Sequence, residues 1–124
     1  YSQLVMPDHI NNAGTLFGGQ MVSWMDLAAA KAAYRFLIDT DAMAAVTRAI
    51  EKVEFKEPVY LGDWVNFTAT VISSGKTSFS IQVEAHAEGR HSQSRLACVA
   101  TVIMVAVKKD ADGNYQKTAH GKTG

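Results

Sequence analysis

The chain is poor in the features that define several protein classes. It has one cysteine, Cys98, so it forms no intrachain disulfide, and its Cys and His residues do not have the spacing of zinc ligands. Its 12 Lys and Arg balance 12 Asp and Glu, and this net charge of zero lacks the broad basic field of nucleic-acid-binding proteins. The longest strongly apolar stretch, residues 96–107, is far shorter than the roughly 20 residues of a membrane-spanning helix. We therefore expect no metal, no nucleic-acid partner, no membrane partner and a reducing, cytoplasmic setting.

The length of the chain bounds its organisation. With 124 residues, of which 48% are hydrophobic, the chain is long enough to bury the core of one domain but too short for two. Residues 110–124 are polar and contain glycine. We expect residues 1–113 to form the domain and residues 114–124 to be a mobile C-terminal tail.

Periodicity predicts one long helix followed by four strands. The helix spans residues 18–38, where Ala, Leu, Met and Lys dominate and no proline occurs. The strands are predicted at residues 44–55, 65–71, 79–85 and 95–107, and residues 2–6 are compatible with a further short strand. In the first of the four, the apolar residues change parity, which predicts a bulge near Glu51-Lys52. The last is apolar at nearly every position, which predicts a central strand covered on both faces.

One buried helix and an antiparallel meander indicate an α+β protein. The helix is apolar over most of its surface, so it cannot be left half exposed. We expect the sheet to curl around the helix and a second subunit to cover what remains.

Asp26 lies on an unexpected side of this helix. At about 100° per residue, the polar residues Lys31 and Arg35 fall on the opposite side from Asp26. The residues on its own side are apolar or small: Gly19, Val22, Ala29, Ala30, Ala33 and Leu37. A carboxylate in such surroundings is costly to bury unless a group outside the helix compensates its charge. Asp26 is therefore a candidate catalytic base, the alternative being that this side of the helix is simply exposed to water.

Gly18-Gly19, at the start of the same helix, is a second candidate. A helix N-terminus presents unpaired N–H groups that can stabilise a developing oxyanion, and glycine lets a ligand approach the backbone closely. Asp26 lies about 10 Å further along the helix axis, which leaves room for a substrate carbonyl and a water. The alternative is that the two glycines only allow a tight entry into the helix.

The run from Asn11-Asn12-Ala13-Gly14 through Gly18-Gly19 to Trp24-Met25-Asp26 resembles the signature of the hotdog-fold acyl-CoA thioesterases. The similarity is greatest to the branch with the bacterial YciA-type enzymes and the mammalian brain and cytosolic acyl-CoA hydrolases. Further matches occur throughout residues 4–113: Val46-Thr47, Phe55, Pro58, Gly62-Asp63, Gly75-Lys76-Thr77-Ser78 and Val105-Ala106-Val107.

This resemblance implies a fold, an activity and an assembly. The fold is a long helix wrapped by a curved antiparallel sheet, and the activity is hydrolysis of an acyl-CoA to a free acid and CoA. No cofactor is implied, since CoA belongs to the substrate. Two protomers are expected to join their sheets edge to edge, with active sites at the dimer interface, and three such dimers to form a hexamer.

The resemblance also implies roles for individual residues. Asp26 becomes the general base or nucleophile, and a backbone amide of Gly18 or Gly19 the oxyanion donor. Asn11, or Asn12 if the loop register shifts, positions water or the carbonyl. Contacts to the CoA substrate are expected from Thr47, Gly75, Lys76, Thr77 and Ser78, and candidates for its 3′-phosphate are Arg48, Lys52 and Lys56.

Two other functions remain alternatives. A hotdog hydratase or dehydratase would pair a histidine with the carboxylate, and the helix that carries Asp26 has no histidine. His9, in the loop before the helix, is the nearest one in the sequence, and His86, His91 and His120 are expected to be exposed. A non-catalytic acyl-CoA-binding module would keep the pocket without a competent carboxylate.

Overall fold

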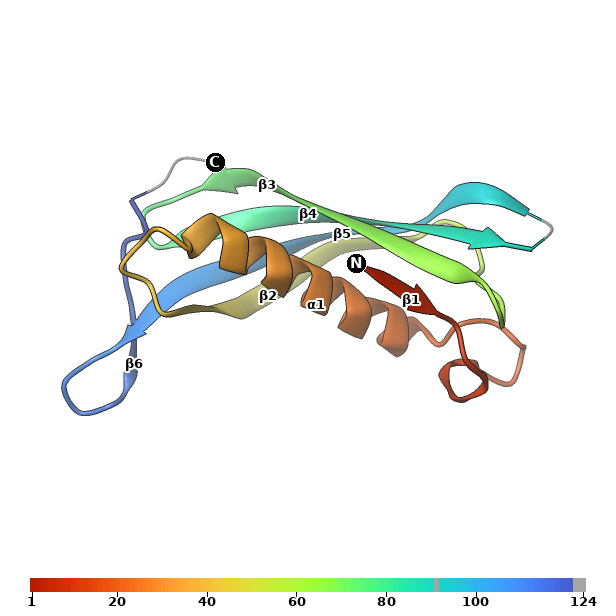
Figure 1. The fold of residues 1–124 in the computed structure, drawn as a ribbon, viewed down its shortest axis with the longest axis horizontal. Coiled ribbons are helices and arrows are strands. Elements are labelled where there is room, and N and C mark those ends of the chain that lie inside the picture. Colours follow the sequence, from red (N-terminus) through yellow and green to blue (C-terminus); the bar gives the residue numbers. More distant parts are fainter. Residues whose placement is uncertain (91, 122–124) are drawn as a thin grey trace.

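The computed structural model describes residues 1–90 and 92–121, in which one long helix lies against one curved sheet (Figure 1). A short 3-10 helix precedes the long helix, and six strands make the sheet. In chain order the elements are β1 (Ser2–Leu4), the 3-10 helix η1 (Pro7–His9), α1 (Gly18–Leu37), β2 (Ala44–Phe55), β3 (Trp64–Ser74), β4 (Ser78–Gly89), β5 (Ser92–Lys109) and β6 (Tyr115–Lys117). The predicted helix, the four long strands and the short first strand are all confirmed.

The sheet is antiparallel with the strand order β1-β3-β4-β5-β2, and β6 adds to β5. The strand predicted to be central, β5, pairs with both β4 and β2. Near its C-terminal end, the consecutive residues Met104, Val105, Ala106 and Val107 are all buried, so both faces are covered there. β2 stands at the end of the sheet in the part of the chain that the structure describes.

The sheet curls around α1 and buries one side of the helix (Figure 1). Met21, Met25, Ala29 and Ala33 on this side are at most 2% exposed. They meet the inward side chains of β4 and β5, which alternate along each strand. Burial of a methionine of this kind stabilises the fold by about 2 kcal/mol.

The bulge predicted in β2 is present. The pairing of β2 with β5 shifts register between Glu51 and Glu54, and Lys52 there has a φ of 56°. A lysine in this left-handed region is strained, because its Cβ crowds the backbone. A second shift lies between Thr47 and Ala49. The bulges bend β2 and thereby help the edge of the sheet to follow the helix.

The C-terminal segment differs from the predicted tail. Residues 115–117 form β6, which pairs with β5 where that strand extends beyond β4. His120 was predicted to be exposed, but it is only 4% exposed and packs its ring against Phe36 and Phe79. The prediction of a mobile tail failed because residues 115–117 gain their order from pairing with β5 and not from an apolar pattern of their own. His86 is half-buried on β4, and His91 lies outside the described residues.

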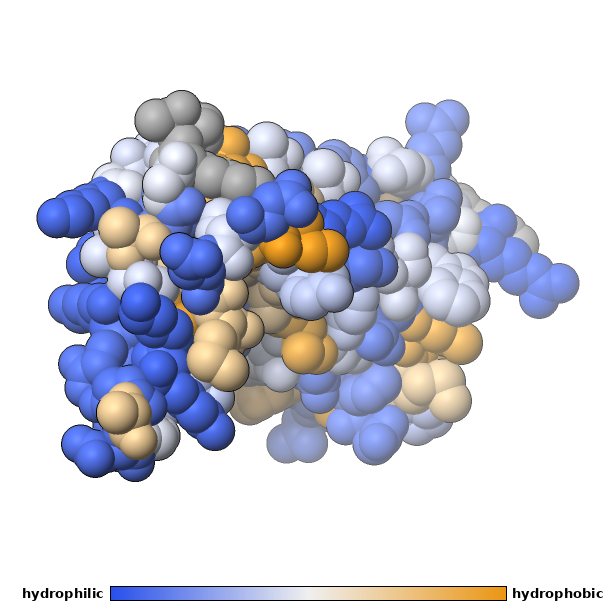
Figure 2. All heavy atoms as spheres, turned by 60° about the vertical axis from the view of Figure 1, so that its left-hand side comes forward, coloured by the Kyte–Doolittle hydropathy of each residue, from blue (hydrophilic) through white to orange (hydrophobic). Residues whose placement is uncertain are grey.

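Apolar side chains also reach the surface. Figure 2, in which the left-hand end of Figure 1 comes forward, shows hydrophobic residues between hydrophilic ones. On α1 and the segment that joins it to β2, the exposed ones include Leu27, Tyr34, Ile38 and Met43. Within residues 1–90 and 92–121, no helix is both long and apolar enough to cross a membrane.

Candidate active site

Asp26 is held by a residue outside its own helix. The hydroxyl of Thr47, on β2, donates a hydrogen bond of 2.7 Å to the Asp26 carboxylate. Asp26 is half-buried and Thr47 is exposed, so this pair lies where the edge of the sheet meets the helix. The Thr47 hydroxyl thus compensates the charge of Asp26, and the contact of Thr47 with the substrate stays a prediction.

The position of Asp26 on the helix differs from the prediction in one respect. Of its predicted neighbours, Ala29 and Ala33 are buried, Val22 is half-buried, and Ala30 is exposed. Asp26 therefore stands at the margin of the buried side of α1 and not at its centre. This margin and the facing side of β2 form a seam, which we call the α1–β2 seam.

The start of α1 offers backbone N–H groups. Phe17 is the N-cap residue, and its side chain makes no capping hydrogen bond. Its carbonyl accepts the N–H groups of Gln20 and Met21, so the amides of Gly18 and Gly19 stand in the first turn, before the regular bonding of the helix begins. A Cβ on Gly19 would come within 2.7 Å of the Phe17 ring, so glycine also keeps this turn compact. The positive end of the helix dipole adds to the suitability of these amides for an oxyanion.

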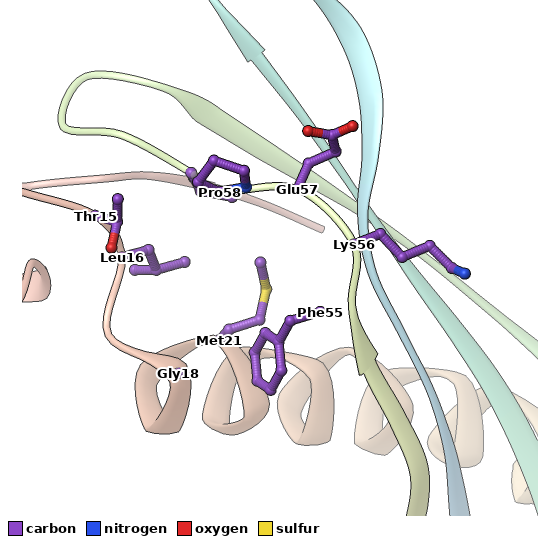
Figure 3. A pocket seen from close by; sticks show the side chains of 9 residues that line it. Thr15, Leu16, Gly18, Met21, Phe55, Lys56, Glu57 and Pro58 are labelled. Atoms are coloured by element: carbon purple, nitrogen blue, oxygen red, sulfur yellow. The ribbon is translucent and has the colours of Figure 1, made fainter.

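A cleft of about 350 Å³ opens beside Gly18 (Figure 3). Leu16, Met21 and Phe55 border the hollow, whereas the side chains of Lys56 and Glu57 point away from it at the rim. The cleft therefore lies between the start of α1 and the C-terminal end of β2.

A second hollow of about 450 Å³ lies at the other end of the seam. Its walls come from the last turns of α1 and from the start of β2, and none of its lining side chains is charged. On α1, Asp26 falls between Gly18, which lines the first hollow, and Ala30, which lines the second. On β2, Thr47 falls between Ala45, which lines the second hollow, and Phe55, which lines the first.

The side chain of Asn11 is used within its own loop. Its Oδ1 accepts the N–H groups of Ala13 (2.9 Å) and Thr15 (3.2 Å), and its Nδ2 lies 3.0 Å from the Thr15 hydroxyl. The structure thus does not bring Asn11 to Asp26 within one chain. Asn12 is exposed in the same loop.

His9 is also engaged in local structure. Its Nδ1 accepts the N–H of Met6 at 3.0 Å, and its ring makes a T-shaped contact with the ring of Trp24. These contacts fasten the loop before α1 to the core. They do not pair a histidine with Asp26, as a hydratase site would require.

The turn formed by Gly75, Lys76, Thr77 and Ser78 is not beside Asp26 in the same chain. Ser78 pairs with Val105 on β5, and β5 separates β4 from β2. The turn is closed by a hydrogen bond from Gly75 N–H to the Ser78 carbonyl (2.8 Å), and the side chain of Lys76 is exposed.

Sequence reasoning missed the arginine that holds one wall of the cleft. Arg95, on β5, forms an ion pair with buried Asp63 at 2.9 Å and donates to the Pro58 carbonyl at 2.9 Å. The loop between β2 and β3 is thereby fixed, and its Val59 carbonyl accepts the N–H of Leu16, just before α1. The only signal in the sequence was the Gly62-Asp63 match, which did not identify the partner.

Two further groups of residues bear on the chemistry. Burial raises the pKa of the Cys98 thiol to about 11, which makes it a poor nucleophile at neutral pH. Lys56 forms an ion pair with Glu54 at 3.0 Å, while Arg48 and Lys52 are exposed on β2. Among residues 1–90 and 92–121, no group of three His, Cys, Asp or Glu side chains is placed to hold a metal ion.

Residues 13–94 match the family model of the thioesterase superfamily. The chain is 34% identical over 111 residues to the acyl-CoA thioester hydrolase YciA of Salmonella typhimurium, covering 86% of this chain and 80% of that protein. It is 30% identical over 115 residues to mouse acyl-coenzyme A thioesterase 11, covering 93% of this chain but only 19% of that longer protein.

A solved structure agrees with these relatives. Cj0915, a hexameric hotdog fold thioesterase of Campylobacter jejuni, is 35% identical and superposes with a TM-score of 0.77, covering 96% of this chain and 88% of that one. The single helix wrapped by a curved antiparallel sheet is thus a hotdog fold. The chain belongs to the thioesterase superfamily.

Proposed function

We propose that this protein hydrolyses acyl-CoA thioesters to a free carboxylic acid and CoA, with Asp26 as the reacting carboxylate. The observation that carries the proposal is the 2.7 Å hydrogen bond between Thr47 and Asp26 at the α1–β2 seam, two turns from the start of α1. The relatives in Salmonella typhimurium and mouse are named an acyl-CoA thioester hydrolase and an acyl-coenzyme A thioesterase, and these names support the substrate class.

The proposed chemistry needs no group beyond the chain, the substrate and water. Asp26 accepts a proton from a water molecule, and the resulting hydroxide attacks the thioester carbonyl carbon. The amide of Gly18 or Gly19 stabilises the oxyanion that forms on the carbonyl oxygen. When the C–S bond breaks, the proton on Asp26 passes to the leaving thiolate of CoA. Direct attack by the Asp26 carboxylate, followed by hydrolysis of the anhydride, is the alternative route for the same residue.

The spacing on α1 suits the first route. Gly19 and Asp26 are seven residues apart, which is about 10 Å along the helix axis. A carbonyl bound at the amide and a water bound at the carboxylate together occupy roughly this length, since each hydrogen bond contributes about 2.9 Å.

We propose that two copies of the chain complete the site. β2 stands at an edge of the sheet, and apolar side chains beside it are exposed, so an edge-to-edge dimer would pair β2 and cover the seam. In that dimer Asn11 and the turn of Gly75, Lys76, Thr77 and Ser78 are assigned to binding the substrate held by Asp26 of the other copy. A trimer of such dimers is proposed because the Campylobacter jejuni relative is hexameric.

The test is the release of CoA thiol from a panel of acyl-CoAs, read with a thiol-reactive dye. The Asp26→Ala variant is expected to lose activity while keeping its fold and oligomeric mass. Asp39→Ala, which removes an exposed carboxylate just after α1, is the matched control and is expected to retain activity. Asn11→Ala is expected to slow turnover less than Asp26→Ala does. If Asp26→Ala retains more than a few per cent of the wild-type rate, Asp26 is not the reacting group.

A further inference from the structure

The hollow at the C-terminal end of α1 is distinct from the cleft beside Gly18. The 450 Å³ of this hollow lies within the range of small-molecule sites. Ala30, Ala33 and Tyr34 line it from α1, Ile38 lines it from just after that helix, and Ala45 lines it from β2. Its side chains offer apolar surface and one phenol, with no ionised group among them.

This hollow continues from the proposed reacting carboxylate. Ala30 is four residues after Asp26, so the two lie on the same side of α1 one turn apart. Ala45 precedes Thr47 by two residues, so both side chains leave β2 on the same face. A ligand chain that starts at Asp26 and follows the α1–β2 seam away from Gly18 therefore enters this hollow directly.

We propose that the hollow binds the hydrocarbon tail of the acyl group and sets the preferred chain length, an inference that rests on the proposed thioesterase function. A saturated chain has no hydrogen-bonding group, so an uncharged hollow accepts it without desolvating an ion. Leu16, Met21 and Phe55 make the cleft beside Gly18 apolar as well, so the continuity of the hollow with Asp26 decides between the two sites.

The geometry also gives a chain length. Tyr34 is eight residues beyond Asp26, which is about 12 Å along the helix axis. An extended hydrocarbon advances about 1.3 Å per carbon, given a C–C bond of about 1.5 Å, so roughly eight to ten carbons reach Tyr34. The substrate is therefore a medium-chain acyl-CoA.

The first measurement is kcat/KM of the wild-type protein for saturated acyl-CoAs of two to sixteen carbons. Each methylene that enters the hollow is expected to raise kcat/KM by about fourfold, and the rise is expected to stop near ten carbons. A protein that hydrolyses acetyl-CoA but shows no rise with chain length would overturn the inference and leave the thioesterase function standing. A protein that releases no CoA from any member of the series would refute the function itself.

Three variants then test where the acyl tail binds. Ala30→Leu fills the hollow at an exposed position and is expected to lower kcat/KM for the ten-carbon substrate by more than tenfold, with the two- and four-carbon substrates within twofold of wild type. Tyr34→Ala opens the far end and is expected to move the limit toward longer chains. Phe55→Ala is the matched control, because it removes an exposed aromatic ring from the other hollow. It is expected to leave the limit where it is.

The opposite results would overturn the inference. If the chain length at which kcat/KM stops rising changes in Phe55→Ala but not in Tyr34→Ala, the tail binds in the cleft beside Gly18. If Ala30→Leu lowers kcat/KM equally for substrates of all chain lengths and changes the oligomeric mass measured by light scattering, a second copy of the protein occupies the hollow instead. Arg35→Leu, a leucine at an exposed position of α1 outside the hollow, controls for a general effect of added apolar surface.

Discussion

Replacing Thr47 by valine tests the contact on which the proposed chemistry depends. Valine keeps the shape of threonine and its preference for strands, but it cannot donate a hydrogen bond to the Asp26 carboxylate. A hydrogen bond to a charged group is worth about 1.5–3 kcal/mol, and the lower end applies here because Thr47 is exposed and Asp26 only half-buried. The expected loss in kcat is therefore about tenfold.

The assay compares kcat and KM of Thr47→Val with those of the wild type and of Thr47→Ser. Serine restores the hydroxyl and is expected to recover most of kcat, whereas a purely structural role of the threonine methyl group would leave Thr47→Ser as impaired as Thr47→Val. KM is expected to change less than kcat, since the hydroxyl acts on the carboxylate rather than on the substrate tail. Thermal melting of each variant separates loss of folded protein from loss of activity.

The size of the effect is itself informative. If a second copy of the chain covers the seam, the hydrogen bond is removed from water, and the loss rises toward a hundredfold. A change of less than twofold, together with an inactive Asp26→Ala variant, would refute the view that Thr47 holds the reacting carboxylate in place.

Three predictions concern the rest of the chain. Arg95→Met leaves the buried Asp63 carboxylate without its ion-pair partner, so thermal unfolding is expected to show a loss of about 3 kcal/mol, and Asp63→Asn combined with it is expected to lose less than the sum of the two single changes. Cys98 is expected to resist thiol reagents at pH 8 until the protein unfolds. Because its folded pKa, about 11, exceeds the unfolded value of 9.0, stability to urea is expected to fall as the pH rises from 9 to 11. His120→Ala removes a buried ring from its contact with Phe79 and is expected to lower the melting temperature by several degrees, whereas a melt unchanged from wild type would contradict the packing described for this segment.

The parts of the fold that follow a local pattern could be predicted. The composition of residues 18–38 favours a helix whatever surrounds it, and the alternation in β3 and β4 reports which face each side chain takes. Even the bulge of β2 left a trace in the sequence, because an extra residue reverses the parity of the apolar positions on either side of Lys52.

Contacts between segments that are distant in the sequence could not be predicted from such local patterns. Arg95 and Asp63 are 32 residues apart, and nothing in either neighbourhood indicates that their charges meet. All three residues of β6 are exposed, and they form a strand because β5 extends past the start of β4 and offers unpaired backbone groups. The site was intermediate between these cases: Asp26 was identified from its apolar surroundings, but its partner on β2 was not.

The position of Asp26 follows from the energetics of burying a charge. At the centre of the buried side of α1, among residues such as Met25, the carboxylate would be surrounded by apolar groups and would lose its hydration without replacement. On the opposite side, near Arg35, it would be exposed to water, where an ion pair with the arginine contributes little. The margin of the helix is the place where one oxygen takes a hydrogen bond from Thr47 while the carboxylate stays within reach of water. The strand at the margin of the sheet supplies that hydroxyl through Thr47, which is why the proposed chemistry depends on β2.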